Sequence, residues 1–323
     1  MTSPLIYRIA FVADEITGFI RNHDSTWSMM QAAHGLGHAV YYTKSLEAAG
    51  SASFLKLSDE FFRSQNHPSS LCSDATKESK LLILDQASID SQVTMNLEDF
   101  DYIFMRKDPP VDDEYKRECK IMAQCKKAKV INKPESLINL NEKLMILNFP
   151  DLIIETIVTD DLEVIKAFVN NHGKVVMKPL DGFGGAGISL LELDSVIECP
   201  SEQMMLQKYI PDIKLEGDKR IIVVNGKPIG ALLRIPPEND FRANLAVGGS
   251  YAKYQMNERD REICDKIKPF LLENGIYFAG VDLIGNYLTE INITSPTCLQ
   301  EINRVEGLEG RDRLEYRLIL SLF

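Results

Sequence analysis

The spacing of apolar residues predicts an α/β unit at the start of the chain. Leu5–Ala13 is an almost continuous apolar run, as expected of a strand that is buried on both faces. Asp24 can cap a helix over residues 25–33, which ends at two glycines. His38–Thr43 then returns as a second strand, so these elements form a β-α-β unit.

The same kind of pattern continues through the first half of the chain. Residues 44–79 are polar and mixed, which suggests a variable excursion. The remaining predicted elements are strands over Lys80–Asp85, Asp101–Met105 and Val130–Asn132, and helices over Asp113–Lys129 and Pro134–Leu147.

Turn signals of β-hairpins dominate the second half. The strongest is Asn225-Gly226, a two-residue turn between strands at Arg220–Val224 and Lys227–Leu233. Residues 236–250 follow without a period, and a loop of this length is either a functional lid or an ordinary surface excursion. Glu258–Glu273 is predicted to be an amphipathic helix.

A glycine-rich stretch, GFGGAG at residues 182–187, matches the G-x-G-x-x-G fingerprint of dinucleotide-binding turns. That fingerprint requires a strand before the glycines and a helix after them. A strand is predicted at Lys174–Met177, but residues 188–193 favour a strand rather than a helix. No Lys-Ser or Lys-Thr follows the glycines, which excludes a P-loop as well. The stretch is therefore predicted to join two strands as a flexible lid.

Residues 280–296, GVDLIGNYLTEINITSP, predict a second hairpin whose register follows from polarity. A two-residue loop would set Val281 opposite Glu290 and mix charge with core on one face. A three-residue loop over residues 285–287 instead pairs Asp282 with Glu290 and gathers the apolar residues on the other face. The pattern favours the three-residue loop.

In that register Asn292 joins Asp282 and Glu290 on one face of the hairpin. Opposed like charges destabilise a sheet unless something neutralises them. Mg²⁺ does so well, because it prefers hard oxygen ligands shared between carboxylates and substrate phosphates. The alternative is a solvated acidic face of a sheet.

Composition and charge limit the class of protein. A chain of 323 residues with 45% hydrophobic residues should fold into two or three domains. The net charge of −11 argues against non-specific binding to nucleic acid or to an anionic membrane, so an anionic ligand would need a local cluster of basic residues. There is no run of about 18 apolar residues and no secretory signal, so a cytoplasmic protein is expected.

The cysteines and histidines suggest no chemistry of their own. The six cysteines are scattered without a C-x-x-C pair, which favours reduced thiols over disulfides or zinc ligands. The five histidines form no recognisable constellation and are assigned no role.

Basic residues that could face a triphosphate are Lys143, Lys178, Arg220 and Arg234. The last three lie at or inside apolar β segments, where an uncompensated charge is costly. Each one alone could be a surface residue with a buried stem. Together with the glycine loop and the acidic hairpin, they predict a site for a nucleoside triphosphate.

In their order along the chain, these features resemble the prokaryotic glutathione synthetases, a family of ATP-grasp ligases. The resemblance covers residues 5 to about 302. It is carried by FMRKDPP (104–110), NEKL (141–144), KPLDGFGG (178–185), GDKRIIVVNG (217–226), RIPPENDFRANLAVGG (234–249) and GVDLIGNYLTEINITSPT (280–297).

The resemblance implies an α/β (α+β) protein of three parts. A doubly wound, parallel-type α/β substrate domain would span residues 1–132, a small ATP-grasp lid domain 133–210 and a catalytic ATP-grasp domain 211–323. It also implies a reaction: ATP phosphorylates γ-glutamylcysteine to an acyl phosphate, which glycine attacks to give glutathione, ADP and phosphate. ATP and Mg²⁺ (or Mn²⁺) would be required, with no nucleic-acid or membrane partner, and a homo-oligomer is expected.

Site residues follow from the resemblance, position by position. ATP would be bound by Lys143, Lys178, the loop Asp181, Gly182, Gly184 and Gly185, the adenine segment Gln207, Lys208, Tyr209 and Ile210, and Asp218 at the ribose. The metal ligands would be Asp282, Glu290 and Asn292. Arg220, Arg234 and Arg242 would be catalytic. The substrates would contact Asp24, Ser25, Arg106, Lys107, Asp108, Asn244, Gly248, Gly249, Ser295, Pro296 and Thr297.

The chain departs from the family pattern at two places. Ser250 replaces a residue that is often basic, and the tail from Gln300 onward matches no family pattern. Two other functions stay open on the sequence: another carboxylate–amine ligase of the same fold, and an ATP-binding module without catalysis. The second is disfavoured because every metal ligand and phosphate-facing arginine is retained.

Overall fold

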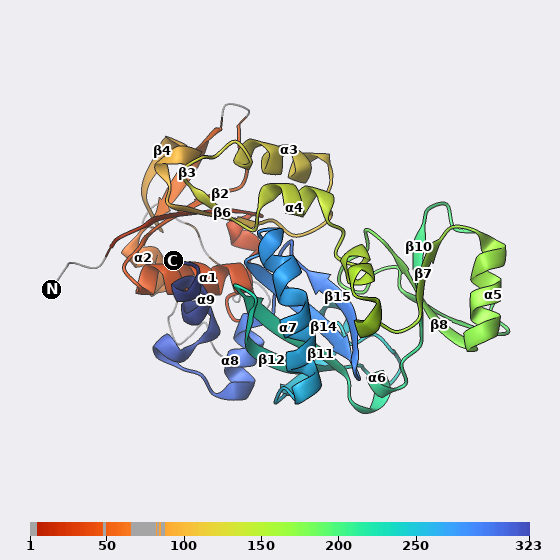
Figure 1. Cartoon of the computed structure of the whole chain (residues 1–323). Helices are drawn as coiled ribbons and strands as arrows, with labels where there is room; N and C mark the ends of the chain where they lie inside the picture. The colour runs from red at the N-terminus through yellow and green to blue at the C-terminus, as the bar shows by residue number, and fades with distance from the viewer. Residues whose placement is uncertain (1–4, 48–49, 66–81, 83, 85–87) are drawn as a thin grey trace.

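The computed structural model describes residues 5–47, 50–65, 82, 84 and 88–323 of the chain. Three β-sheets organise it (Figure 1). The predicted strand at Lys80–Asp85 lies outside the described residues, apart from Leu82 and Leu84.

The first sheet has six strands in the order β4-β3-β2-β1-β5-β6. Its parallel part is formed by β1 (Arg8–Ala13), β2 (Ala39–Thr43), β5 (Tyr102–Arg106) and β6 (Lys129–Ile131), and β3 (Ser51–Leu57) and β4 (Ile89–Asn96) add an antiparallel edge. α1 (Ser25–Gly35) and α9 (Leu314–Leu322) lie on one side of this sheet, and α3 (Asp113–Met122) and α4 (Pro134–Asn139) lie on the other (Figure 1). The predicted doubly wound α/β unit is confirmed.

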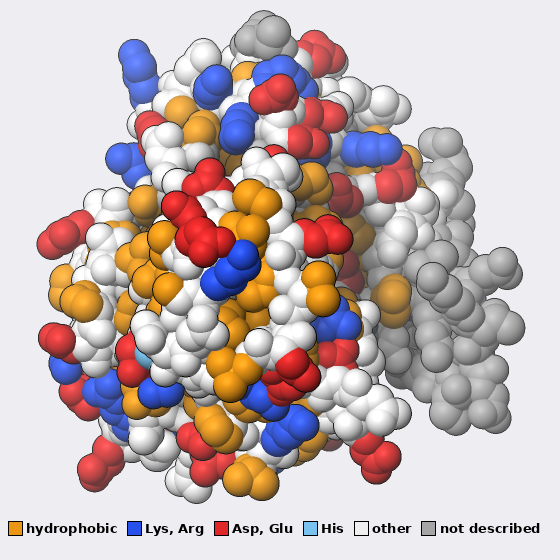
Figure 2. All heavy atoms as spheres, turned by 90° about the vertical axis from the view of Figure 1, so that its right-hand side faces the viewer, with side chains coloured by type: hydrophobic (Ala, Val, Ile, Leu, Met, Phe, Trp, Pro, Cys, Tyr) orange, Lys and Arg blue, Asp and Glu red, His pale blue; other side chains and the backbone are white. Residues whose placement is uncertain are grey.

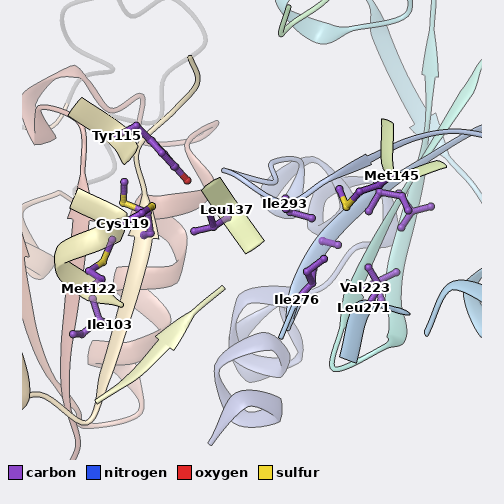
Figure 3. Packing of buried hydrophobic residues seen from close by; sticks show 14 of the residues in the cluster. Ile103, Tyr115, Cys119, Met122, Leu137, Met145, Val223, Leu271, Ile276 and Ile293 are labelled. Carbon is purple, nitrogen blue, oxygen red and sulfur yellow. The ribbon is translucent and has the colours of Figure 1, made fainter. Parts of the chain in front are cut away.

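Strand β1 shows why the first apolar run has no polar alternation. Ala10 and Val12 point into a core shared with α3 and α4, whereas Ile9 and Phe11 point into a core shared with α1 and α9. Figure 3 shows the first of these cores continuing from Cys119 on α3 to Leu271 on α7, beneath the C-terminal sheet. Packing of both faces therefore fixes the position of the first sheet against the rest of the molecule.

The second sheet is small and antiparallel, with strand order β7-β10-β8-β9. One helix, α5 (Leu162–His172), packs on it through Ile165, Phe168 and Val169. The strands are β7 (Thr156–Thr159), β8 (Lys174–Pro179), β9 (Ser189–Glu192) and β10 (Met204–Lys208). Figure 2 looks onto this side of the molecule and shows basic and acidic side chains interspersed with apolar ones.

The third sheet has the order β13-β12-β11-β14-β15 and is antiparallel throughout. The strands are β11 (Asp218–Val224), β12 (Lys227–Ile235), β13 (Ser250–Lys253), β14 (Phe278–Ile284) and β15 (Tyr287–Asn292). The predicted turn at Asn225-Gly226 is confirmed, with positive φ at both residues. The predicted helix α7 (Glu258–Glu273) is confirmed as well, and Asn257 forms a capping box with Asp260 at its start.

Two predicted helices were too long. α3 ends at Met122, because the backbone N–H groups of Lys126 and Lys127 donate to the Glu98 carboxylate at 2.6 and 2.8 Å and draw the chain away. α4 ends at Asn139, and a separate 3₁₀ turn over Leu144–Asn148 follows. The side chain of Asn141 starts that turn by accepting from the next N–H groups, so local hydrogen bonds compete with the helix. Within the predicted excursion at 44–79, β3 and α2 (Asp59–Ser64) are regular, and β4 was also missed.

The C-terminal tail is part of the core. α8 (Leu299–Glu306) and α9 pack against α1 and against β12, with Leu314, Leu318 and Ile319 fully buried. The terminal Phe323 stacks on Tyr102 with ring centroids 3.9 Å apart. The tail from Gln300 onward therefore joins the first sheet to the third.

Among the described residues, no helix has both the length and the apolar composition to cross a membrane. The five described cysteines are free thiols, and Cys72 lies outside the described residues. The free thiols agree with the expectation of reduced cysteines.

Candidate active site

A cavity of about 430 Å³ opens where the three sheets meet. Its wall takes residues from β8 and the glycine loop, from β10 and the residues after it, and from β11, β12, β14 and β15. The first sheet contributes Asp108, just after β5. The lining includes six Lys and Arg and five Asp and Glu, a small net positive charge inside a protein of net charge −11.

The carboxylate hairpin has the predicted residue pairing, but its turn differs from the predicted turn. Asp282 lies opposite Glu290 and Gly280 opposite Asn292, as expected. The turn, however, contains two residues and not three, because Ile284 pairs with Tyr287. A β-bulge beside Asp282 restores the register, and the buried Thr289 at this point donates its hydroxyl to the Asp282 carbonyl at 3.0 Å. The predicted three-residue loop was therefore wrong.

Asp282 is the centre of a buried charge network. Arg220 donates from Nε to its Oδ1 at 2.6 Å and from Nη2 to its Oδ2 at 3.0 Å, and Nη2 of Arg234 lies 2.9 Å from the same Oδ2. Burial favours the neutral acid, but the charges of Arg220 and Arg234 and their hydrogen bonds outweigh it and lower the pKa of Asp282. The two guanidinium groups lie side by side because β11 and β12 are paired antiparallel neighbours.

Asp218 contacts Arg234 as Asp282 does, but its pKa shifts in the opposite direction. It contacts the same Arg234 nitrogen, Nη2, yet burial and the Asp282 charge raise its pKa to about 6. Two carboxylates that compete for one arginine thus differ in how easily they take up a proton.

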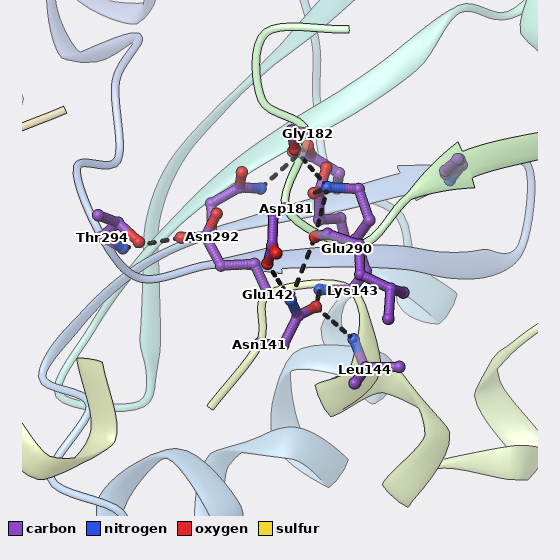
Figure 4. Close-up of polar contacts among 12 residues, drawn as sticks. Asn141, Glu142, Lys143, Leu144, Asp181, Gly182, Glu290, Asn292 and Thr294 are labelled. Carbon is purple, nitrogen blue, oxygen red and sulfur yellow. Dashed lines mark hydrogen bonds and ion pairs between the residues drawn. The ribbon is translucent and has the colours of Figure 1, made fainter. Parts of the chain in front are cut away.

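The two predicted phosphate lysines lie on the same side of the cavity. Lys143 donates to the carbonyl oxygens of Gly182 and Leu180 and lies 3.3 Å from Glu290 (Figure 4). Lys178 donates to the Gln207 side chain at 2.6 Å. Burial lowers the pKa of Lys178, although the nearby Glu290 opposes that effect. Lys143 therefore holds the glycine loop at the position where Glu290 enters the cavity.

The glycine loop joins β8 to β9, which pair antiparallel, so the prediction of a strand–loop–strand segment is confirmed. Its tip meets the second long loop, because Arg242 donates to the Gly185 carbonyl at 2.9 Å. A Cβ at Gly185 would lie 2.9 Å from the Asn244 side chain, and the residue has φ +86°, so both contact and backbone require glycine. Arg242 is held by Asp240, whose pKa its hydrogen bonds lower to about 2.

Glu142 is a functional candidate that sequence reasoning missed. It lines the cavity, and its carboxylate accepts from the backbone N–H groups of Ile293 and Thr294 at 2.6 and 2.8 Å (Figure 4). Burial and the Glu290 charge raise its pKa. Its position within NEKL, directly before Lys143, was the available signal. Glu142 thereby fixes the exit of β15 next to the lysine.

The predicted substrate residues fall into two groups. Asp108, Asn244, Ser295 and Thr297 line the cavity, as do Lys208, Tyr209 and Ile210 among the predicted ATP residues. Eight residues of the predicted site do not line the cavity. They are Asp181, from the predicted ATP residues, and Asp24, Ser25, Arg106, Lys107, Gly248, Gly249 and Pro296, from the predicted substrate residues. Their contacts show what several of them do instead.

Residues behind the wall hold the first sheet to the turn after β15. Asp24 caps α1 by accepting from the Trp27 N–H at 2.9 Å. Arg106 donates to the Thr26 hydroxyl at 3.1 Å and to the Pro296 carbonyl at 3.0 Å. Lys107 pairs with the buried Glu118 at 2.9 Å. Direct contact with substrate stays a prediction for these residues.

The hairpin trio suits a divalent cation by its chemistry. Asp282, Glu290 and Asn292 present two carboxylates and one amide oxygen to one cavity. The Asn292 side chain donates its NH₂ to Asp282 and to the Gly280 carbonyl, both at 3.1 Å, which directs its oxygen away from them. In the described residues no three His, Cys, Asp or Glu side chains cluster as metal ligands, so the amide is needed as the third donor.

The chain is similar to known proteins along most of its length. Family models described as prokaryotic glutathione synthetase match the chain twice, the N-terminal domain over residues 7–137 and the ATP-grasp domain over residues 142–307. The glutathione synthetase of Thermosynechococcus vestitus is 38% identical over 311 residues, covering 93% of this chain and 95% of that protein. The glutathione synthetase of Pseudomonas aeruginosa is 33% identical over 320 residues, covering 95% of this chain and 96% of that protein.

Solved structures share the fold at low identity. D-cycloserine synthetase DcsG has a TM-score of 0.63 at 11% identity, covering 98% of this chain and 99% of that chain. The ATP-grasp ligase PsnB, complexed with a phosphomimetic variant of its minimal precursor, Mg and ADP, has a TM-score of 0.58 at 14% identity, with coverage of 98% and 99%. The chain belongs to the prokaryotic glutathione synthetase family of ATP-grasp ligases.

Proposed function

We propose that this chain joins γ-glutamylcysteine to glycine at the expense of ATP, and that the cavity described above is where it does so. The observation that carries the proposal is the convergence of Lys143, Lys178 and the glycine loop with the Asp282–Glu290 pair. That arrangement supports a ligase that positions a triphosphate and neutralises its charge, which is the main requirement of phosphoryl transfer.

The nucleotide is proposed to lie between the second and third sheets. The adenine would lie along residues 207–210 of β10 and its continuation, with the ribose near Asp218. Lys143 and Lys178 would bind the phosphates, and the glycine loop, residues 181–185, would cover them. Buried lysines with few competing waters interact strongly with phosphate oxygens, because the local dielectric is low.

The divalent cation would be held by Asp282, Glu290 and Asn292. It would neutralise the triphosphate and orient its terminal phosphate, and the three hard oxygen donors suit Mg²⁺ or Mn²⁺. The lysine and arginine partners of these carboxylates would then turn to the phosphates and to the transferring group.

The chemistry would proceed in two displacements. One oxygen of the cysteinyl carboxylate attacks the terminal phosphorus of ATP, the bond to the bridging oxygen breaks, and ADP leaves. The glycine ammonium group loses one proton to water, and its neutral amine attacks the carbonyl carbon of the acyl phosphate. Phosphate leaves with the C–O bond electrons, and the new amide nitrogen loses its second proton to water. Arg220 and Arg234 are proposed to stabilise the charge that builds up in both steps.

Acyl phosphates hydrolyse readily, so the reacting carbonyl must be kept from water. The contact between Arg242 and Gly185 supports a cover made of two loops, the glycine loop and residues 236–250. Asn244, Gly248 and Gly249 would belong to this cover, and Ser295, Pro296 and Thr297 would receive glycine. Asp24, Ser25, Arg106, Lys107 and Asp108 would face or support the dipeptide.

Phosphate release is the direct test. The purified chain with ATP and Mg²⁺ should release phosphate only when γ-glutamylcysteine and glycine are both present, with one glutathione formed per phosphate. Turnover with other acid–amine pairs but not with this one would assign a different ligase activity to the same site. The proposal also includes a lid domain over residues 133–210, a cytoplasmic location and a homo-oligomer. Analytical ultracentrifugation tests whether the chain is a homo-oligomer.

A further inference from the structure

His23 lies on the cavity wall, although its sequence context suggested no role. It sits in the turn directly before α1, so the first sheet's domain contributes it together with Asp108. Ser295 and Thr297, from the turn after β15, line the same cavity. The His23 side chain is 54% exposed, so one part of the imidazole is covered and another faces open space.

Helix α8 holds the imidazole in one orientation. Nδ1 of His23 lies 2.7 Å from Oε1 of Glu301, whose side chain is fully buried. Arg304 donates to the same Oε1 at 2.7 Å and to the Asn22 carbonyl, and Gln300 donates to the Arg21 and Asp24 carbonyls at 3.1 and 2.7 Å. The backbone on both sides of His23 is therefore clamped, and Nε2 is the nitrogen left for a ligand.

The charges around His23 favour the protonated ring. The hydrogen bond to Glu301 raises the pKa of His23, burial and the Arg304 charge oppose this, and the Asp24 charge supports it. A protonated imidazole donates from both nitrogens, so Nε2 can donate to an anion while Nδ1 donates to Glu301.

We propose that His23 recognises the α-carboxylate at the glutamyl end of γ-glutamylcysteine, donating to it from Nε2 while Glu301 holds Nδ1. The inference rests on the proposed function, because that dipeptide end carries one carboxylate and one ammonium group. An imidazolium and the Asp108 carboxylate, both on the wall of this cavity, match this pair of charges. The reacting carboxylate belongs at the other end, near Arg220 and Arg234 on the third sheet.

Two variants separate the nitrogen facing the cavity from the one facing Glu301. In His23→Asn, the side-chain amide can replace Nδ1 at Glu301 but leaves no donor at the Nε2 position. We expect KM for γ-glutamylcysteine to rise about tenfold, as for a lost charge-assisted hydrogen bond, with kcat and KM for glycine and ATP within about twofold of wild type. In His23→Gln, the longer amide reaches the Nε2 position and should restore part of the affinity.

The pH dependence of kcat/KM is a second measurement, and it would not depend on His23 if that residue had only a structural role. For wild type, kcat/KM for the dipeptide should fall as the pH rises through the pKa of His23, which lies above the usual value for histidine. His23→Gln should lack this fall, because an amide does not titrate in that range. A matched control is His34→Gln, which removes another histidine–carboxylate pair, His34–Asp59, away from the cavity.

Substrate analogues complete the test. With 4-aminobutyrylcysteine, which lacks the α-carboxylate, wild type and His23→Asn should have equal kcat/KM. With glutarylcysteine, which keeps the carboxylate and lacks the ammonium group, the variant should again be about tenfold worse. The inference is overturned if His23→Asn raises KM for glycine instead, or if its penalty persists with 4-aminobutyrylcysteine. If wild type fails to turn over γ-glutamylcysteine and glycine, the proposed function itself fails.

Discussion

Replacing Arg234 by methionine would test whether the buried arginine network serves catalysis more than stability. Methionine keeps the apolar stem and removes the guanidinium that lies 2.9 Å from Asp282 and contacts Asp218. If Arg234 stabilises the transferring phosphoryl group, its loss should raise the barrier by about 3 kcal/mol, roughly a 150-fold fall in kcat/KM. The rate of phosphate release with γ-glutamylcysteine and glycine measures this fall in kcat/KM.

The expected cost in stability is smaller than usual for a broken buried pair. Removing one partner typically costs about 3–5 kcal/mol, because a charge stays buried and unpaired. Asp218, with a pKa of about 6, can instead take up a proton, which at pH 7 costs about 1.4 kcal/mol. Asp282 keeps both contacts to Arg220. The free energy of unfolding at pH 7 should therefore fall by only about 1–2 kcal/mol.

The same reasoning fixes the pH dependence. In wild type, Asp218 has a folded pKa above its unfolded value, so its contribution to stability is present below about pH 4 and is lost as the pH rises through about 6. In Arg234→Met that pKa rises further, so stability should keep falling between about pH 7 and 8, where the wild-type contribution has become nearly flat. Urea unfolding at both pH values measures this, with Arg259→Met, a partly exposed arginine paired with Glu262, as the control.

Two results would refute this reasoning. A kcat/KM within a few-fold of wild type would remove Arg234 from the transferring group. A loss of 3–5 kcal/mol at pH 7, the range for an unrelieved buried charge, would mean that Asp218 does not take up the proton.

Three further predictions concern the metal site, the backbone and the tail. Glu290→Gln should abolish phosphate release while the melting temperature stays near wild type, because Lys143 keeps its carbonyl partners; wild-type turnover would exclude a metal role. Gly217→Ala should destabilise by more than about 1 kcal/mol in urea unfolding, because φ is +74° and a Cβ would lie 2.4 Å from the Arg234 carbonyl oxygen. Leu318→Ala should cost about 2–5 kcal/mol, because the side chain is fully buried; a loss below 1 kcal/mol would show that α9 is dispensable to the core.

Elements with a strong local pattern were predictable. The turn at Asn225-Gly226 and the helix Glu258–Glu273 were both correct, since their signals lie within a few residues of chain. The helix predicted to reach Lys129 failed because Glu98, distant in sequence, accepts hydrogen bonds from the residues after Met122. Such a capping partner leaves no trace in the local pattern.

The hairpin that carries Asp282 shows both what could be predicted from the sequence and what could not. Polarity alone identified which carboxylates face each other, because a strand exposes alternate residues and charge avoids the core. It did not reveal that a bulge near Thr289, and not a longer turn, sets the register, since both give the same pairing at Asp282.

The amino-acid sequence by itself determined many of the elements and which carboxylates face each other, and it predicted the phosphate lysines, the third metal ligand and a lid. Only the tertiary structure decided which residues reach the cavity: it placed His23 on the wall and Asp24 behind it. The reason is that side-chain direction here depends on contacts between α8 and the turn before α1, residues almost the whole chain apart. Local periodicity reports burial along one element, whereas a site depends on how several elements are packed together.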